Sequence, residues 1–186
     1  MQHAKSVVYA AFAGAAIAAL IWAIPQQSLS KSTRVPEFTH RAAKDWLNSA
    51  PLSLESLRGK AVLVEFWTFD CINCRRSIPW MKAVQARFTG QDLQIVAVHT
   101  PELAHEKQLK NVVAAVSKLG ITYPVMIDLD YSYWNALDNR YWPAFYLIDK
   151  RGVLREIAIG ELHVGESRAR SFEQHIASAV SESVVP

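Results

Sequence analysis

The chain has 186 residues, a formal net charge of +3 and 51% hydrophobic residues, which suits one domain with a substantial core. Charges of both signs are interspersed and no basic block is longer than two residues, so nucleic-acid binding is not predicted. The two cysteines, Cys71 and Cys74, are too few for a disulfide framework or a structural zinc site. A bridge closing so short a loop would also stabilise the fold little, which favours a redox pair.

The N-terminal region predicts a membrane anchor. His3 and Lys5 precede an uncharged apolar run at positions 7–24, which would span roughly 27 Å as a helix. The positive-inside rule then leaves the N-terminus in the cytoplasm and the rest outside. A cleaved signal peptide predicts the same exported domain, whereas a buried soluble helix does not. In a Gram-negative source the chain would be anchored in the inner membrane, with a periplasmic domain.

Three regions follow from this pattern. We expect an anchor or signal segment over residues 1–25, a polar linker rich in serine and proline over 26–40, and one folded domain over 41–186. In the domain, a short helix is expected over 41–48. A turn over 52–60 then leads into the main strand.

The apolar, β-favouring run Ala61–Trp67 is typical of a central strand covered on both faces. Glu65 interrupts this run, and burying an acid is costly unless it has a partner or a task. One interpretation places Glu65 at an edge or end position that faces water. The other makes it a partly buried acid near the cysteines that relays protons during thiol exchange.

The cysteines come directly after this strand. Cys71 is expected in a turn at the N-terminus of a helix reaching residue 88, where free N–H groups and the helix dipole lower the pKa of a thiol. Two following arginines add positive charge, whereas Asp70 opposes ionisation. Cys74 lies one turn further in and is expected to be more covered. Cys71 would therefore attack a partner disulfide, and Cys74 would release the mixed disulfide.

The rest of the chain alternates predicted strands and helices. His99 and Glu102 follow the second strand. His99 is interpreted either as a neighbour of the reactive cysteine or as an ordinary surface or core histidine, and Glu102 and Glu106 as a solvated helix start. The expected elements are strands over 93–98, 124–127, 144–148 and 153–159, and helices over 104–119, 132–137 and 166–182.

Residues 67–74 read WTFDCINC, which resembles the thioredoxin-like domains of the TlpA and DipZ type, whose motif often reads WTxxCINC. The resemblance covers about residue 35 to the C-terminus. It implies an α/β thioredoxin-like fold, a central mixed sheet flanked by helices, with a TlpA-type strand–helix insertion. Glu65 falls where the family carries a buried acid, and Pro143 where it carries a cis-proline. Trp67, Trp142 and Pro143 would line the substrate groove.

The resemblance also implies a function. Cys71 and Cys74 would form a redox-active disulfide that exchanges electrons with protein disulfides outside the cytoplasm. Such domains usually act as reductants, are fed by a membrane thiol electron carrier and sometimes serve cytochrome c maturation. No cofactor or metal is expected, because the cysteines carry the electrons. Asp70 replaces the usual tryptophan before the first cysteine, which bears on the redox potential and the partner surface.

Two alternatives belong to other classes of function. Related folds act as thiol peroxidases, but those sites resemble a cysteine preceded by a Pro-xxx-Thr pattern that is absent here. A copper-binding assembly factor would need a third ligand besides the cysteines, and His163 is the candidate. The copper-delivering branch of the fold resembles a CxxxC spacing, which differs from the CxxC of this chain.

Overall fold

The computed structural model describes residues 34–183, so the predicted anchor and the first part of the predicted linker lie outside the described residues. Within residues 34–183, no helix is long and apolar enough to cross a membrane. The strands are β1 Trp46–Leu47, β2 Ala61–Trp67, β3 Leu93–His99, β4 Val125–Ile127, β5 Ala144–Ile148 and β6 Leu154–Ile159. The α-helices are α1 Ile72–Arg87, α2 Leu109–Lys118, α3 Ser132–Ala136 and α4 Ser167–Ser181, and two 3-10 turns are η1 Ala43–Asp45 and η2 Ala104–Lys107.

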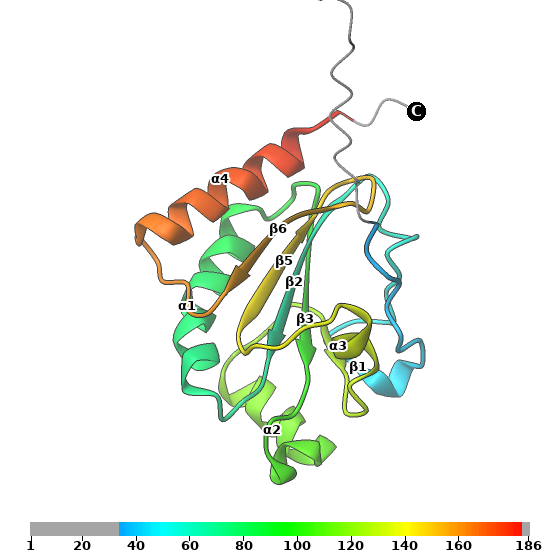
Figure 1. Ribbon diagram of the computed structural model, residues 1–186. Coiled ribbons are helices and arrows are strands. Elements are labelled where there is room, and N and C mark those ends of the chain that lie inside the picture. Colours follow the sequence, from blue (N-terminus) through cyan, green and yellow to red (C-terminus); the bar gives the residue numbers. More distant parts are fainter. Residues whose placement is uncertain (1–33, 184–186) are drawn as a thin grey trace, which may run out of the picture. The chain divides into compact units, whose positions relative to one another are not determined.

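The strands form one mixed sheet in the order β1-β4-β3-β2-β5-β6, with helices on both faces (Figure 1). β2 pairs in parallel with β3, and β3 with β4, whereas β5 runs antiparallel to both β2 and β6. Every residue of β2 is buried, as its continuous apolar run predicted. The α/β class and the predicted order of strands and helices after residue 60 are therefore confirmed, apart from the break at residue 108 described below.

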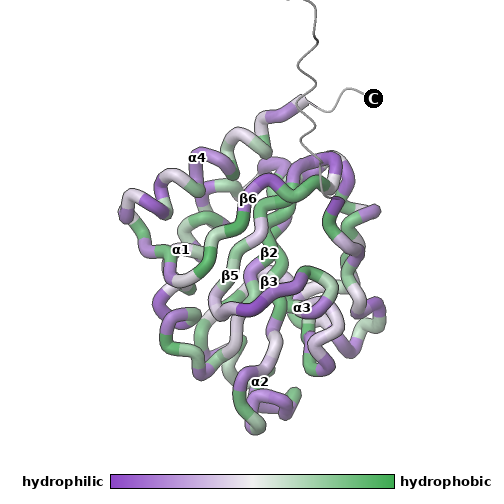
Figure 2. The backbone as a smooth tube through the Cα atoms, in the orientation of Figure 1, coloured by the Kyte–Doolittle hydropathy of each residue, from purple (hydrophilic) through white to green (hydrophobic). Residues whose placement is uncertain are grey.

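Two apolar cores lie on opposite faces of the sheet. One contains buried side chains of α1, α2 and α4, and the other contains Tyr133 of α3 and the segment before β2. Successive β2 side chains enter the two cores in alternation, because side chains of a strand point to opposite faces. The apolar colour follows the central strands, while α4 alternates between apolar and polar positions (Figure 2).

The segment before β2 differs from the sequence-based expectation. Val35 and Phe38, which we assigned to the linker, are buried, and Phe38 packs edge-on against Trp46. The expected helix over 41–48 is wrong: only η1 is helical, and β1 follows at once. Trp46 and Leu47 pair with Met126 and Val125 of β4. Sheet pairing and burial of Trp46 outweigh the local helix propensity.

The expected single helix over 104–119 is also wrong, because it breaks at Gln108 into η2 and α2. The buried Glu106 side chain accepts hydrogen bonds from the backbone N–H groups of Glu102 and Leu103, each at 2.7 Å. These bonds cap the start of η2. A helical pattern in the sequence cannot indicate such a tertiary contact.

Candidate active site at the start of helix α1

The strand β2 ends at Trp67, and a three-residue loop leads to Cys71, which is the N-cap residue of α1. The Cys71 sulfur accepts a hydrogen bond from the Cys74 backbone N–H, at 3.2 Å. Cys71 is partly exposed and Cys74 is fully buried, and both are free thiols. One sulfur is therefore reachable from solvent, and the second lies behind it one helical turn away, as predicted.

The surroundings of Cys71 lower the pKa of its thiol and so favour the thiolate. The hydrogen bond from the Cys74 side chain, helped by the N–H groups of Cys74 and Asn73, lowers the pKa of Cys71 to about 7, although burial acts in the opposite direction. Burial, and next the contact with Cys71, raises the pKa of Cys74 far above its ordinary value. At neutral pH about half of Cys71 is thus a thiolate, the reactive form, while Cys74 keeps its proton.

The charges around Cys71 differ from those expected. The carboxylate that raises the pKa of Cys71 is Glu102, and not Asp70. The Asp70 carboxylate instead binds His105, which lies beside it in space. Neither arginine is among the groups that lower the pKa, and Arg76 forms an exposed ion pair with Glu161 at 3.3 Å. Thiolate stabilisation therefore comes from the first turn of α1 itself.

Glu65 is 1% exposed on the central strand β2, so the interpretation that it faces water at an edge is wrong. Burial raises the pKa of Glu65 to about 8; the neighbouring Tyr123 hydroxyl lowers it and the Cys71 thiolate raises it further. The charge of Glu65 in turn raises the pKa of Cys74. A buried carboxyl with a raised pKa thus lies close enough to both thiols for their charges to influence one another.

The expected groove residues occupy different depths. The Trp142–Pro143 peptide bond is cis; Pro143 is buried and Trp142 is half-buried. Trp142 and Cys71 pack against the same core, and the Trp142 indole N–H donates to the Thr100 carbonyl at 3.0 Å. Trp67 is only 1% exposed, so its side chain does not reach the surface and can support a groove only from below.

A polar cluster beneath the site loop was missed by the sequence analysis. Glu106 is buried rather than solvated, and it accepts a hydrogen bond from the Asp70 backbone N–H at 3.0 Å in addition to its bonds within η2. Burial opposes its ionisation, but bonds from the Thr68 hydroxyl and from backbone N–H groups lower the pKa of Glu106. No sequence pattern at 103–106 indicates this contact, because Leu103 cannot serve as a side-chain cap. Glu106 therefore ties the loop before Cys71 to the segment after β3.

His99 lies in the same cluster. It is fully buried, its Nε2 lies 3.3 Å from the Thr68 hydroxyl, and its ring stacks on Phe69. Burial lowers the pKa of His99 to about 4, so the ring is neutral at physiological pH. His99 thus supports the loop as a core histidine and is not a surface residue.

Within residues 34–183, the side chains arranged closely enough to hold a metal ion do not include the cysteines. His163 pairs with Glu161 at 2.8 Å and forms no three-ligand cluster with Cys71 and Cys74 in that part of the chain. The one such cluster there is His40, Asp128 and Asp130. The buried Asp128 is already occupied, because it accepts hydrogen bonds from the Thr100 hydroxyl and from two backbone N–H groups of α3.

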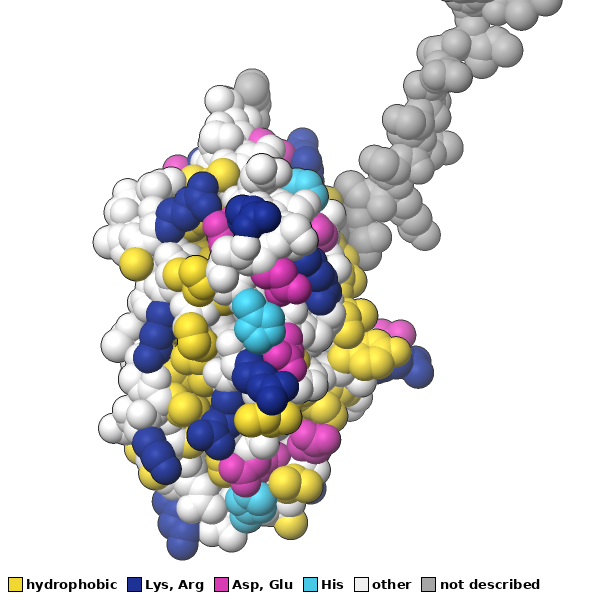
Figure 3. All heavy atoms as spheres, turned by 90° about the vertical axis from the view of Figure 1, so that its left-hand side faces the viewer, with side chains coloured by type: hydrophobic (Ala, Val, Ile, Leu, Met, Phe, Trp, Pro, Cys, Tyr) yellow, Lys and Arg dark blue, Asp and Glu magenta, His cyan; other side chains and the backbone are white. Residues whose placement is uncertain are grey.

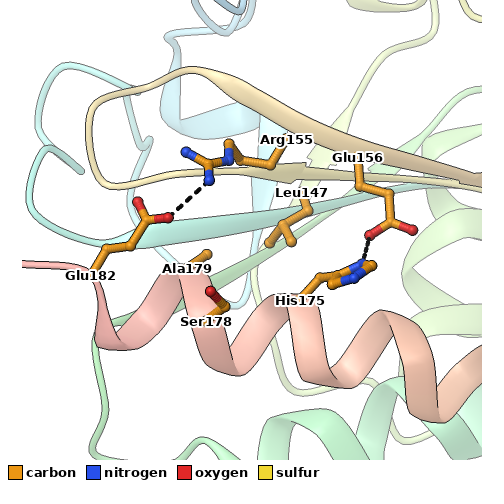
Figure 4. Close-up of a pocket in the computed structure, with 7 residues that line it drawn as sticks. All are labelled: Leu147, Arg155, Glu156, His175, Ser178, Ala179 and Glu182. Atoms are coloured by element: carbon orange, nitrogen blue, oxygen red, sulfur yellow. Dashed lines mark hydrogen bonds and ion pairs between the residues drawn. The ribbon is translucent and has the colours of Figure 1, made fainter.

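A pocket of about 230 Å³ lies between β6 and α4, and no cysteine lines it (Figure 4). Two ion pairs, Arg155–Glu182 and Glu156–His175, cross it. Leu147 in its wall pairs with Leu63, in the half of β2 away from the cysteines. The surface that carries α1 and α4 mixes basic, acidic and apolar side chains (Figure 3). This pocket is therefore separate from the cysteine pair at the start of α1.

Comparison with known proteins agrees with this site. The family model described as the AhpC/TSA family matches residues 32–157. The chain is 46% identical over 119 residues to the protein DipZ of Mycobacterium bovis, covering 62% of this chain but 17% of DipZ. It is 30% identical to the thiol-disulfide oxidoreductase YkuV of Bacillus subtilis, covering 68% of this chain and 83% of YkuV.

A solved structure, the thiol:disulfide interchange protein of the thioredoxin family from Chlorobium tepidum, superposes with a TM-score of 0.64 at 26% identity. The match covers 81% of this chain and 97% of that one. The fold and these relatives define a thioredoxin-like thiol–disulfide oxidoreductase, of the kind that the WTFDCINC segment suggested. The chain belongs to the AhpC/TSA family.

Proposed function

We propose that this chain is an extracytoplasmic reductant of protein disulfides that works through Cys71 and Cys74. The observation that carries the proposal is the partly exposed Cys71 at the N-cap of α1, whose sulfur accepts the Cys74 N–H while the second cysteine is buried one turn further in. A lowered thiol pKa on the accessible cysteine suits attack, and a protonated inner cysteine suits delayed release.

In the first step, the Cys71 thiolate attacks one sulfur of the partner's disulfide. The partner's S–S bond breaks, its other sulfur leaves as a thiolate, and a mixed disulfide with Cys71 forms. Cys74 then transfers its proton to the Glu65 carboxylate and attacks the Cys71 sulfur. The second partner thiolate is released and the Cys71–Cys74 disulfide forms, so two electrons pass from this chain to the partner.

We assign the remaining roles as part of the same proposal. Trp142 and the cis-linked Pro143 form the wall of the partner groove, with Trp67 supporting it from below. The segment from α2 to α3 is the TlpA-type insertion. Residues 1–25 anchor the domain to the membrane, where a thiol electron carrier returns two electrons to the Cys71–Cys74 disulfide. The uncharged run at 7–24 and the likeness to DipZ support this location.

The test is a trapping experiment. A Cys74→Ser variant should accumulate mixed disulfides with exported proteins through Cys71, and a Cys71→Ser variant should trap none. The redox potential, measured against dithiothreitol and glutathione, should be low enough for the dithiol to reduce protein disulfides. An empty trap, or a potential typical of oxidants, would contradict the proposal. Fast oxidation of Cys71 by peroxide in stopped flow would favour a thiol peroxidase instead.

A further inference from the structure

We infer that Tyr123 is a positioning residue for Glu65: its hydroxyl holds the ionised carboxylate in place beneath Cys74. The inference rests on the proposed function, which makes Glu65 the proton acceptor for Cys74. Tyr123 is 2% exposed and lies just before β4, outside the WTFDCINC segment and far from it in sequence.

The strand register brings the two side chains together. Glu65 of β2 pairs with Ala97 of β3, and Ala97 pairs with Val125 of β4, so the three lie in a row across the sheet. Tyr123 precedes Val125 by two positions and packs in the same core as α1. Because Ala97 has only a methyl group, it leaves the tyrosine room to extend over β3 toward Glu65.

The backbone around Tyr123 is held from the other side. The Asn48 side-chain amide donates to the carbonyl oxygens of Ile121 and Tyr123, at 2.9 and 3.0 Å. The Pro124 carbonyl accepts from the Ala97 N–H at 2.9 Å. The ring is therefore presented from a fixed backbone.

Two buried polar atoms are left without a partner among residues 34–183. Glu65 Oε1 and Tyr123 Oη form no hydrogen bond there, yet each group perturbs the pKa of the other, so a small movement of the tyrosine ring would let them meet. A protonated carboxyl can donate as well as accept, but a carboxylate only accepts. The tyrosine O–H therefore gains a charge-assisted bond only when Glu65 is ionised.

The groups around Glu65 also indicate that Tyr123 favours the ionised carboxylate. The thiols of Cys71 and Cys74 approach from α1, and Tyr123 approaches from the start of β4. Burial and the Cys71 thiolate both raise the pKa of Glu65, and Tyr123 is the described group that lowers it. Without Tyr123, we expect the pKa of Glu65 to rise further, so that a smaller fraction of the carboxyl is ionised and able to accept a proton from Cys74 at a given pH.

The experiment follows the Glu65 carboxyl by carbon-13 NMR in the reduced protein across pH. Tyr123→Phe removes only the hydroxyl and should raise the pKa of Glu65 by about one unit or more. The pH midpoint of Cys74-dependent release should rise by the same amount. Tyr133→Phe, a buried tyrosine of the opposite core, is the matched control and should leave both values unchanged. Should Tyr123→Phe fail to fold, difluorotyrosine at position 123, a stronger donor, should lower both values.

The outcomes separate the two proposals. A Glu65 that titrates at the same pH in wild type, in Tyr123→Phe and with difluorotyrosine overturns the role of Tyr123 and leaves that of Glu65 standing. A Glu65 that does not titrate between about pH 6 and 10 in the wild type overturns the relay itself, and the role of Tyr123 with it. Shifts of opposite sign in the two Tyr123 variants support the inference.

Discussion

Replacing Glu65 by Gln should make the protein more stable at alkaline pH, because a carboxyl that prefers its neutral form is removed from the core. Burial raises the pKa of Glu65 from 4.5 to about 8. The folded state therefore binds this proton more tightly than the unfolded state does. Its contribution to stability is complete below about pH 4.5 and is lost as pH rises toward 8.

The size of the effect follows from the shift. Each pH unit between the two pKa values changes the free energy of unfolding by about 1.4 kcal/mol, so ionising Glu65 costs about 4 to 5 kcal/mol by pH 8 or 9. A neutral Gln carries none of this pH dependence. Relative to Glu65→Gln, the wild type should lose about 2.5 kcal/mol between pH 5 and pH 7.

Urea unfolding of the reduced protein at each pH unit from 5 to 9 measures this difference. Cys71 and His99 also make the free energy of unfolding depend on pH. Both proteins contain these two residues, so most of that dependence cancels when wild type and Glu65→Gln are compared. Glu55→Gln, at an exposed carboxyl, is the matched control and should follow the wild-type curve. If the curves of wild type and Glu65→Gln run parallel across this range, the buried carboxyl does not titrate as the structure indicates, and the relay loses its basis.

Three further predictions concern the loop around the thiols. In the reduced protein, Cys71 should be alkylated with a midpoint near pH 7 and much faster than Cys74, and equal rates would refute the assigned roles. Glu102→Gln should move that midpoint down by about 0.2 to 0.5 unit, because an exposed carboxylate near the sulfur is removed; an upward shift would contradict this. Glu106→Gln should cost about 2 to 3 kcal/mol of stability in urea unfolding, since an amide cannot accept from Asp70, Glu102 and Leu103 as a carboxylate does. An unchanged midpoint would show that these bonds are dispensable.

Where the sequence-based predictions were wrong, a contact between distant segments had outweighed a local pattern. Trp46 and Leu47 read as helical but pair with β4, and Trp46 lies 80 positions before its partner Met126. The helix expected over 104–119 broke because Glu106 turns inward to cap the loop before Cys71. Local propensity is worth tenths of a kcal/mol per residue, and burying a tryptophan or a capped carboxylate is worth more.

The sequence alone determined the central strand, the cysteine pair at the head of a helix and the order in which the cysteines are covered. These features depend on local periodicity and on spacing within one helical turn, which the chain carries in itself. Only the tertiary structure decided that Glu65 is buried, that Glu102 rather than Asp70 opposes the thiolate, and that Tyr123 and Glu106 reach the site. The charge that a side chain carries depends on what surrounds it in space, and that environment comes from strands and loops far apart in the sequence.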